Sequence, residues 1–419
     1  MKMMRYVKGL AVVMAVMGGM TVTSCEDEPD KYEIADGLPS IRYVRMTSPE
    51  VSDSLITGAY LSNTVCLVGD NLRSIYELYF NDQKAILNTS VMTDNTVIVD
   101  VPSTIPSVVS NKIYMVTLNK DTVTYDFNVI VSAPEVSSMS NEYAAPGTEV
   151  TIHGDYFIDD PNVPLSVSIG EVPVTEITSI SQTSVSFVVP QGATADYVSV
   201  TSVYGTGRSS FRYMEDRGLL FDFDDDGDDA LFNYNGWHPS VIGTLSEVPS
   251  IDNNYLIFQG DLDNGTWDES RFVFEYWPNG DAVTPYLNTL VDFSDLSNLQ
   301  YKFEVNIPDA WSACAMQIML TTNNEVSGSN QNNGFFQNET FPRALWIPWQ
   351  SSGSYTTDGW TTVTIPLSEF RYGSSGTSIN PLSATDITGM EIFVYGGGVT
   401  GTACSTTICI DNIRVVPIY

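Results

Sequence analysis

Alternation between apolar and polar residues dominates the chain beyond residue 37, and it is the strongest constraint on what this chain can fold into. Short runs rich in Val, Ile, Thr, Tyr and Phe are separated by Gly, Pro, Asn, Asp and Ser. No long segment has the 3.6-residue period of an amphipathic helix. Runs with a period of two form strands that bury one face of a sheet. The pattern therefore predicts an all-β protein.

An internal repeat divides the first half of the chain. The run 65–72 matches the run 150–157, 85 residues later, and the run 96–102 matches 184–190, 88 residues later. Two offsets that agree within a few residues indicate two copies of one small module, with an insertion or deletion between them. We expect the modules to span residues 38–132 and 133–215. Hinges are expected at Pro134 and in the stretch 213–216.

The last part of the chain, residues 216–419, has a different composition. It holds all seven tryptophans and is rich in Asn and Gly. Alternating runs recur at 299–305, 315–320, 359–367, 390–395 and 408–415. About 200 residues of such strands suit one larger jelly-roll β-sandwich with long loops.

The N-terminus has the parts of a secretory signal. Basic residues (Lys2, Arg5, Lys8) precede an apolar run at 10–20, which is too short to cross a bilayer. Small residues then lead into Cys25, followed by an acidic cluster at 26–30. This ending resembles the lipobox of bacterial lipoproteins, and the acidic cluster resembles the tag that exports Bacteroidetes lipoproteins to the cell surface. The resemblance implies a signal peptide at 1–24, lipid on Cys25, an acidic tether at 25–37 and anchoring on the extracellular face of the outer membrane.

Composition excludes several functions. With 18 basic and 51 acidic residues the net charge is −33, which argues against nucleic acid as a partner. Only two histidines are present, His153 and His238, and no G-x-S-x-G motif, so a Ser-His-Asp mechanism and a multi-histidine metal site are both disfavoured. Cys404 and Cys409 either pair across a turn or remain buried thiols.

Three phrases resemble known families. G-T-E-V-T-I-H-G at 147–154 resembles the IPT/TIG domain, an immunoglobulin-like sandwich. G-W-T-T-V-T-I-P-L at 359–367 and I-D-N-I-R-V at 410–415 resemble the late strands of carbohydrate-binding jelly rolls. With the leader, the whole chain resembles the surface glycan-binding protein B family of gut Bacteroidetes. The resemblance implies a non-catalytic receptor for a polysaccharide, with a linear β-glucan or a hemicellulose such as xyloglucan or mixed-linkage β-glucan as ligand. It also implies a TonB-dependent importer and surface hydrolases as partners.

Aromatic residues in the last domain are the expected sugar-binding groups, because the C–H face of a sugar ring packs flat on an indole or phenol. Trp237 lies in a turn-rich stretch, and Tyr276 and Trp277 end a strand, where adjacent side chains point to opposite faces. The family's ligand aromatics resemble this spacing. A second platform is predicted from Trp346 and Trp349, with Arg343 beside them. Trp360 opens an alternating strand and is assigned to the core, whereas Trp267 and Trp311 are left unassigned.

No catalytic cofactor is expected, but one acidic stretch resembles half of a calcium loop. Residues 222–227 read D-F-D-D-D-G, which places Asp222, Asp224 and Asp226 at ligand spacing, and Asp411 on the last strand is a further candidate. The twelfth position is Asn233 rather than the Glu of an EF-hand, and no flanking helices are predicted from the sequence. A solvated acidic turn is the alternative explanation.

Two other functions remain open from the sequence. A surface glycoside hydrolase needs two carboxylates in one cleft, and four acidic residues of the last domain are available for that role: Asp268, Glu269, Glu275 and Glu339. A protein-binding adhesin would suit immunoglobulin-like modules equally well. The concentration of tryptophan in the last domain argues against the adhesin.

Overall fold

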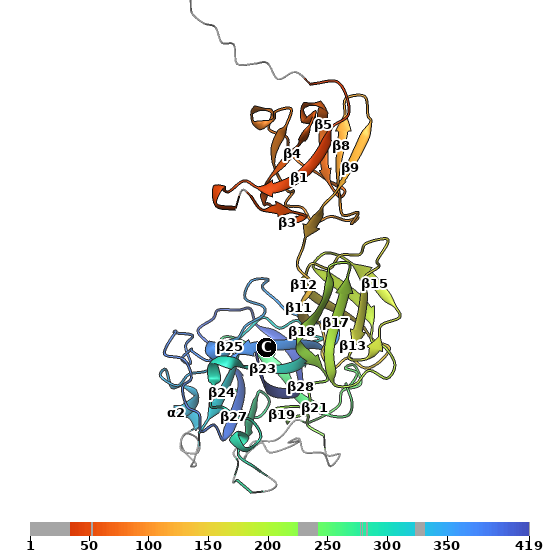
Figure 1. Cartoon of the computed structure of the whole chain (residues 1–419). Helices are drawn as coiled ribbons and strands as arrows, with labels where there is room; N and C mark the ends of the chain where they lie inside the picture. Colours follow the sequence, from red (N-terminus) through yellow and green to blue (C-terminus); the bar gives the residue numbers. More distant parts are fainter. Residues whose placement is uncertain are drawn as a thin grey trace, which may run out of the picture. The chain divides into compact units, whose positions relative to one another are not determined.

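The computed structural model describes residues 34–51, 53–224, 242–276, 278, 280–281, 284–322 and 332–418. These residues are built almost entirely of β-strands, so the predicted all-β class is confirmed (Figure 1). The chain divides into two compact units between Ile130 and Val131. None of the helices in the described ranges is long and apolar enough to cross a membrane. The described helices are α2 (Asn332–Phe336) and the 3-10 turns η1 (Pro49–Val51), η2 (Leu72–Ser74), η3 (Thr89–Val91), η4 (Leu287–Thr289), η5 (Leu296–Asn298) and η6 (Leu367–Glu369).

The first unit contains one small module made of three sheets. One sheet has the order β2-β1-β4-β7, the second β6-β5-β8-β9, and β3 pairs with β10 in parallel. Apolar residues at alternate positions of the strands, such as Val65, Val97 and Met115, are fully buried. The strands are β1 (Ser40–Met46), β2 (Leu55–Ile56), β3 (Gly58–Tyr60), β4 (Thr64–Asp70), β5 (Ile75–Phe80), β6 (Gln83–Lys84), β7 (Thr96–Asp100), β8 (Lys112–Thr117), β9 (Thr122–Asp126) and β10 (Asn128–Ile130).

The second unit begins with another module, whose strands follow the order β14-β13-β17-β18-β11-β12-β16-β15. A single bridge, Val136 to Ser209, joins β11 to β18 and so links two four-stranded halves. Their apolar faces share one core that includes Ile152, Phe187 and Val200. The strands are β11 (Glu135–Met139), β12 (Glu149–Asp155), β13 (Ser166–Ile169), β14 (Val172–Pro173), β15 (Ile177–Ile180), β16 (Ser184–Val188), β17 (Asp196–Ser202) and β18 (Gly205–Tyr213).

The repeat seen in the sequence has the same structural basis in both modules. The first copy forms the pair β4–β7 and the second forms the pair β12–β16, both antiparallel. A glycine lies near the end of β4 and another near the end of β12. A Cβ added to Gly69 would lie 1.9 Å from the carbonyl oxygen of Ser40, and one added to Gly154 would lie 1.8 Å from that of Glu135. The glycine is repeated because the neighbouring strand, β1 in the first module and β11 in the second, lies too close to this position to leave room for a side chain.

The C-terminal part of the second unit is a sandwich of two sheets. The larger has the order β20-β21-β28-β23-β26, with β19 also on β28, and the smaller has the order β22-β27-β24-β25. The long strand β28 is buried along most of its length, since it lies inside its sheet and under the second one. The strands are β19 (Leu219–Phe221), β20 (Ile242–Gly243), β21 (Tyr255–Leu262), β22 (Val273–Tyr276), β23 (Leu299–Asn306), β24 (Ala315–Thr321), β25 (Ala344–Trp346), β26 (Thr361–Pro366), β27 (Gly389–Tyr395) and β28 (Cys404–Pro417).

The expected hinge at 213–216 is wrong. Tyr213 is fully buried, and the backbone N–H of Met214 donates to the carbonyl of Glu142 at 2.8 Å. The carboxylate of Glu215 is also buried and accepts from the guanidinium of Arg217 at 2.6 Å. A stretch whose side chains and backbone are bonded in this way is held in place rather than free to bend.

Candidate functional site

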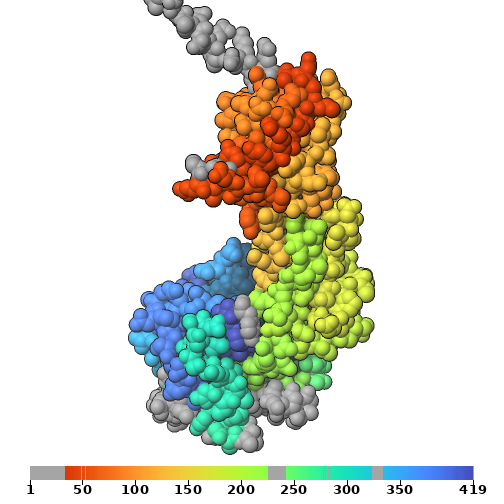
Figure 2. Space-filling view, in the orientation of Figure 1, coloured from red at the N-terminus to blue at the C-terminus, as the bar shows by residue number. Residues whose placement is uncertain are grey.

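The second module and the C-terminal sandwich are joined by hydrogen bonds between the start of β26 and the loop after β11. The N–H of Thr362 donates to the carbonyl of Ser140 at 2.9 Å, and the N–H of Glu142 donates to the hydroxyl of Thr362 at 2.8 Å. The space-filling view shows the yellow-green module packed against the C-terminal residues (Figure 2). The two parts therefore form one continuous surface, on which a site can draw residues from both.

A buried ionic cluster lies under this junction. The carboxylate of Glu142 accepts from Lys302 and, at 2.8 Å, from Arg414, and Arg414 also donates to Glu304 at 2.9 Å. All four side chains are at most 4% exposed. Burial, the largest effect, raises the pKa of Glu304 and lowers that of Lys302. Because charges removed from water need partners, the cluster ties the module to the sandwich tightly.

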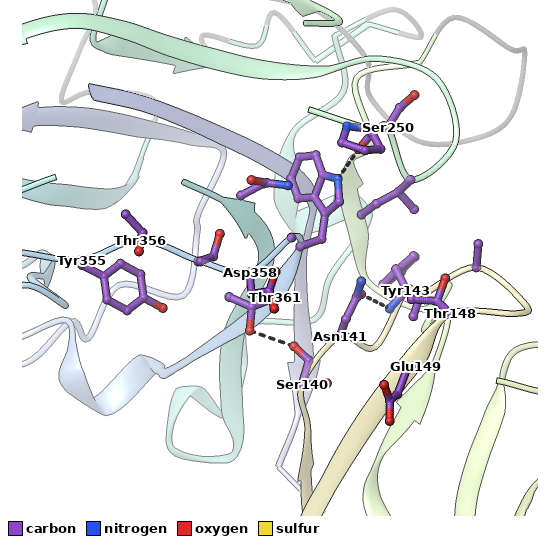
Figure 3. Close-up of a pocket in the computed structure, with 18 residues that line it drawn as sticks. Ser140, Asn141, Tyr143, Thr148, Glu149, Ser250, Tyr355, Thr356, Asp358 and Thr361 are labelled. Carbon is purple, nitrogen blue, oxygen red and sulfur yellow. Dashed lines mark hydrogen bonds between the residues drawn. The ribbon is translucent and has the colours of Figure 1, made fainter. Parts of the chain in front are cut away.

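A pocket of about 540 Å³ opens at the same junction (Figure 3). Its walls come from residues 140–149 of the module and from 249–251, 306 and 355–361 of the sandwich. Thr361 and Ser140 approach each other at its base, where the Thr361 hydroxyl donates to the Ser140 carbonyl at 2.8 Å. On the module side, the side chain of Asn141 accepts from the N–H of Tyr143 at 2.9 Å, a local turn that shapes the loop.

Trp360 contributes its indole to this pocket. Gly359 has φ +76°, a conformation that glycine adopts without strain, and this turn precedes the indole. The Trp360 N–H donates to the carbonyl of Pro249 at 2.6 Å, and its ring meets Tyr255 edge to face at 5.3 Å. Trp360 thus packs against Tyr255, as its strand position suggests. It is nevertheless only half-buried, so part of its ring faces the pocket.

Of the predicted Tyr276–Trp277 pair, Tyr276 belongs to the core. It is 1% exposed, its ring meets Phe221 at 5.0 Å, and its hydroxyl donates to the carbonyl of Pro285 at 2.7 Å. A ring enclosed in this way is not accessible to a polysaccharide, which corrects its assignment as a binding residue. Trp237 and Trp277 lie outside the described residues, and their roles stay predictions.

Arg343 and Trp349 are also buried, which corrects their assignment to a second platform. Arg343 is fully buried and donates to the carbonyls of Phe336 at 2.7 Å and Asn338 at 2.9 Å. It therefore holds the segment after α2 in place instead of meeting a ligand. Trp349 is 4% exposed, and its indole N–H donates to the carbonyl of Cys314 at 3.0 Å.

Trp346 remains a half-buried residue on the edge strand β25. Its ring lies 5.5 Å from both Phe303 and Trp311 and 5.9 Å from Tyr355. Trp267 is half-buried too and caps Phe393 and Tyr395 at 5.0 and 4.9 Å on the other face of the smaller sheet. A binding role for Trp346 stays a prediction.

Comparison with known proteins agrees with this architecture. Residues 134–213 match the family model of the IPT/TIG domain, and residues 213–417 match that of the surface glycan-binding protein B xyloglucan-binding domain. A crystal structure of a surface glycan-binding protein B from Prevotella bryantii is 40% identical, with a TM-score of 0.83, and the match covers 92% of this chain and 100% of that one. This chain belongs to the surface glycan-binding protein B family.

Other relatives of this family member are more distant. An IPT/TIG domain-containing protein from Bacteroides ovatus is 28% identical over 156 residues, which cover 36% of this chain and 31% of that protein's length. A surface glycan-binding protein B from Bacteroides uniformis is 17% identical, with a TM-score of 0.45, over 91% of this chain and 100% of that one. The family assignment therefore depends on the Prevotella bryantii protein.

In this family member the expected calcium ligands lie in different surroundings. The Asp222 carboxylate accepts from the N–H of Asp224 at 3.1 Å, and Asp224 accepts from the N–H of Asn254 at 2.6 Å. Asp411 is fully buried, and Asp226 lies outside the described residues. Within the described ranges no group of three or more His, Cys, Asp or Glu side chains is placed to hold a metal ion. A structural calcium ion stays a prediction.

The described cysteines of this family member are free, so Cys404 and Cys409 do not pair. Both lie on β28, five residues apart, and an extended strand separates such residues by roughly 16 Å. A disulfide requires Cα atoms within about 7 Å.

Sequence reasoning missed most of the pocket. Tyr143, Asn306 and Tyr355 line it but come from segments far apart in the chain. Nothing local to these residues marks them as neighbours. The one signal available was Trp360, because a tryptophan next to Gly359 at the start of a strand is well placed to be partly exposed.

Proposed function

We propose that this chain is a non-catalytic, lipid-anchored receptor that captures a neutral plant polysaccharide at the cell surface. A linear β-glucan or hemicellulose is the proposed ligand, with xyloglucan and mixed-linkage β-glucan as the first choices. The observation that carries the proposal is the agreement with the Prevotella bryantii surface glycan-binding protein B over 92% of the chain. The match of residues 213–417 to a xyloglucan-binding domain supports the choice of ligand.

Aromatic stacking would supply the binding energy. Covering one sugar face removes ~60 Å² of apolar surface from water, worth ~1.5 kcal/mol at ~25 cal/mol per Å². Two or three such contacts supply ~3–4.5 kcal/mol before the cost of association, which corresponds to a dissociation constant of ~10⁻³ M or weaker for one site. Weak binding suits a receptor that must release its ligand to a partner. The proposed partners are surface hydrolases and a TonB-dependent importer.

Two of the acidic residues considered for a hydrolase lack the property of a general acid. Burial alone would raise the pKa of Asp268, but hydrogen bonds from Ser270 and Arg271 outweigh it and lower that pKa. Burial alone would also raise the pKa of Glu339, but hydrogen bonds from Ser375 and Ser374 outweigh burial and lower that pKa. The general acid of a glycosidase needs a raised pKa, so neither Asp268 nor Glu339 suits that role. The carboxylate of the third candidate, Glu269, accepts a hydrogen bond from the indole N–H of Trp267 at 2.6 Å.

Affinity electrophoresis of residues 25–419 in gels containing xyloglucan, mixed-linkage β-glucan, galactomannan or starch tests the proposal. We expect retardation by a β-glucan, lost in Trp277→Ala and in Trp237→Ala. Tyr76→Ala is the matched control, because Tyr76 is a 53% exposed aromatic of the first unit. Absence of retardation by all four glycans would overturn the proposal, and release of reducing ends would establish a hydrolase instead.

The anchor is tested separately. The leader and the acidic residues after Cys25 support lipidation. Cells grown with an alkyne fatty acid should label the wild type and not the Cys25→Ala variant. External protease should digest the wild type on intact cells. Equal labelling of both proteins would exclude lipidation at Cys25.

A further inference from the structure

The pocket at the junction of the second module and the sandwich has an amide side chain among its lining residues. Asn306 ends β23, lines the pocket and is only 4% exposed. Within the described part of the chain its side chain makes no hydrogen bond, and its amide atoms are not among the buried polar atoms that lack a partner. The amide therefore reaches the pocket, where its N–H and C=O groups are available to a ligand or to water.

Three aromatic side chains line the same pocket as this amide. Tyr143 comes from the module, and Tyr355 and Trp360 come from the sandwich. Tyr143 is only 7% exposed, because its hydroxyl donates to the carbonyl of Glu215 and the guanidinium of Arg414 lies over its ring at 4.7 Å, so it forms part of the pocket wall. Tyr355 and Trp360 are the half-buried rings that a ligand can reach. Trp360 is held through its N–H, which leaves the ring as the surface it offers. Aromatic faces combined with amide groups are the chemistry that binds sugar rings.

The electrostatics of the pocket select a neutral ligand. None of the described lining residues is Lys, Arg or His, whereas Glu149 and Asp358 are carboxylates. An anionic ligand such as a phosphate or a uronic acid would find no positive partner there. Carboxylate, amide and hydroxyl groups instead match the hydroxyls of a neutral saccharide. A volume of about 540 Å³ is within the usual range for small-ligand pockets.

The pocket is formed before any ligand arrives. Its two sides are joined at Ser140 and Thr362, over the buried cluster that contains Glu142. On the sandwich side, the N–H of Ile307 donates to the Thr357 hydroxyl at 2.8 Å, and Tyr355 and Trp311 exchange backbone hydrogen bonds at 2.9 and 3.0 Å. Binding in a preformed site avoids the entropy cost of ordering its walls.

We propose that this junction pocket is a second saccharide site, which takes a short stretch or an end of a neutral glucan chain, separate from the aromatics predicted at Trp237 and Trp277. The ligand class depends on the proposed glycan-binding function. A second weak site on the same rigid unit would raise the avidity for a long polysaccharide without a tighter primary site.

The test uses 5-fluorotryptophan in the mature chain, whose seven tryptophans give seven fluorine resonances. The Trp360→Phe variant identifies the Trp360 resonance. On titration with cellotetraose we expect this resonance to shift both in the wild type and in Trp277→Ala. In Asn306→Ala the same shift should require about five- to tenfold more ligand, the effect of one lost hydrogen bond.

Asn298→Ala is the matched control. Asn298 is an exposed asparagine just before the opposite end of β23, outside the pocket, and its variant should titrate like the wild type. A Trp360 resonance that stays still while another tryptophan moves would overturn the second site and leave the proposed function intact. If no tryptophan responds to cellotetraose, the second site is also overturned, and affinity electrophoresis on polysaccharides decides the proposed function independently.

Discussion

The guanidinium of Arg414, on the last strand of the sandwich, lies 2.8 Å from the carboxylate of Glu142, in the second module. The two residues are 272 positions apart, and both are buried. Together with Lys302 and Glu304 they join the module to the sandwich within one compact unit.

Glu142→Gln should be strongly destabilising. The change keeps the shape of the side chain but leaves Lys302 and Arg414 with less negative charge in a buried site. Breaking a buried ion pair on one side typically costs about 3–5 kcal/mol. Chemical denaturation of the full mature chain measures the loss, with Glu176→Gln, an exposed glutamate of the same module, as control. Equal stability of the two variants would contradict a structural role for the cluster.

Glu215 should make stability depend on pH. Burial would raise its pKa, but hydrogen bonds and charge from Arg217 outweigh burial and lower it. Its contribution is therefore present above the unfolded pKa of about 4.3 and is lost as pH falls through the lower folded pKa. Thermal unfolding between pH 7 and pH 3 should show a steeper decline for the wild type than for Glu215→Gln. The difference at neutral pH should be about 1–2 kcal/mol. If the stability of the wild type and of Glu215→Gln fell equally with pH, Glu215 would not be the source of the pH dependence.

The stability of an Asp411→Asn variant tests whether the buried acidic residues around Asp411 bind calcium. Burial first, and then the nearby charges of Asp252 and Asp224, raise the pKa of Asp411. Without a metal ion, Asp411→Asn should stabilise the protein at pH 7 by about 1–3 kcal/mol, because the ionised form has an unpaired buried oxygen. We expect this gain in buffer with EDTA. A rise in the wild-type melting temperature with CaCl₂, absent in Asp411→Asn, would instead establish a calcium site.

The four cysteines in the described ranges should each behave as a free thiol. Alkylation in denaturant should modify Cys66, Cys314, Cys404 and Cys409 without prior reduction. In the native state Cys404 should react first because it is half-buried, whereas burial raises the pKa of Cys314 to about 11 and that of Cys409 to about 12. Peptide mass spectrometry gives the order. A mass two hydrogens lower than that of the reduced chain would indicate a disulfide.

Gly69→Ala and Gly154→Ala should each destabilise their own module. The added methyl would meet the carbonyl of Ser40 or of Glu135 and force the first strand away. We expect a loss of about 2–3 kcal/mol for each variant, as for other overpacked sites. Gly192→Ala is not an equivalent control, because its φ of +83° is itself strained for alanine. Gly243→Ala is suitable, since nothing lies within 4 Å of its added Cβ. Hydrogen exchange would assign each loss to its module.

Local patterns were sufficient for much of the fold. The alternation at 359–367 predicts β26, and the runs around Gly69 and Gly154 predict two equivalent strand pairs. Such patterns work because the period of a strand and the close approach at a glycine are properties of a few neighbouring residues. For the binding residues the same reasoning failed at Tyr276, Arg343 and Trp349. Whether a tryptophan, tyrosine or arginine is a core residue or a surface residue depends on what the rest of the chain places over it.

By itself, the sequence determined the all-β class, the repeated module and the family, because strand period, repeat spacing and short motifs depend only on residues close together in the chain. Only the tertiary structure decided which aromatics are enclosed, that Glu142 of the second module pairs with Arg414 of the sandwich, and that Asn306, Tyr143 and Trp360 line one pocket. These relationships join residues separated by tens to hundreds of positions. They arise from packing and from the need to pair buried charges, which no local pattern records.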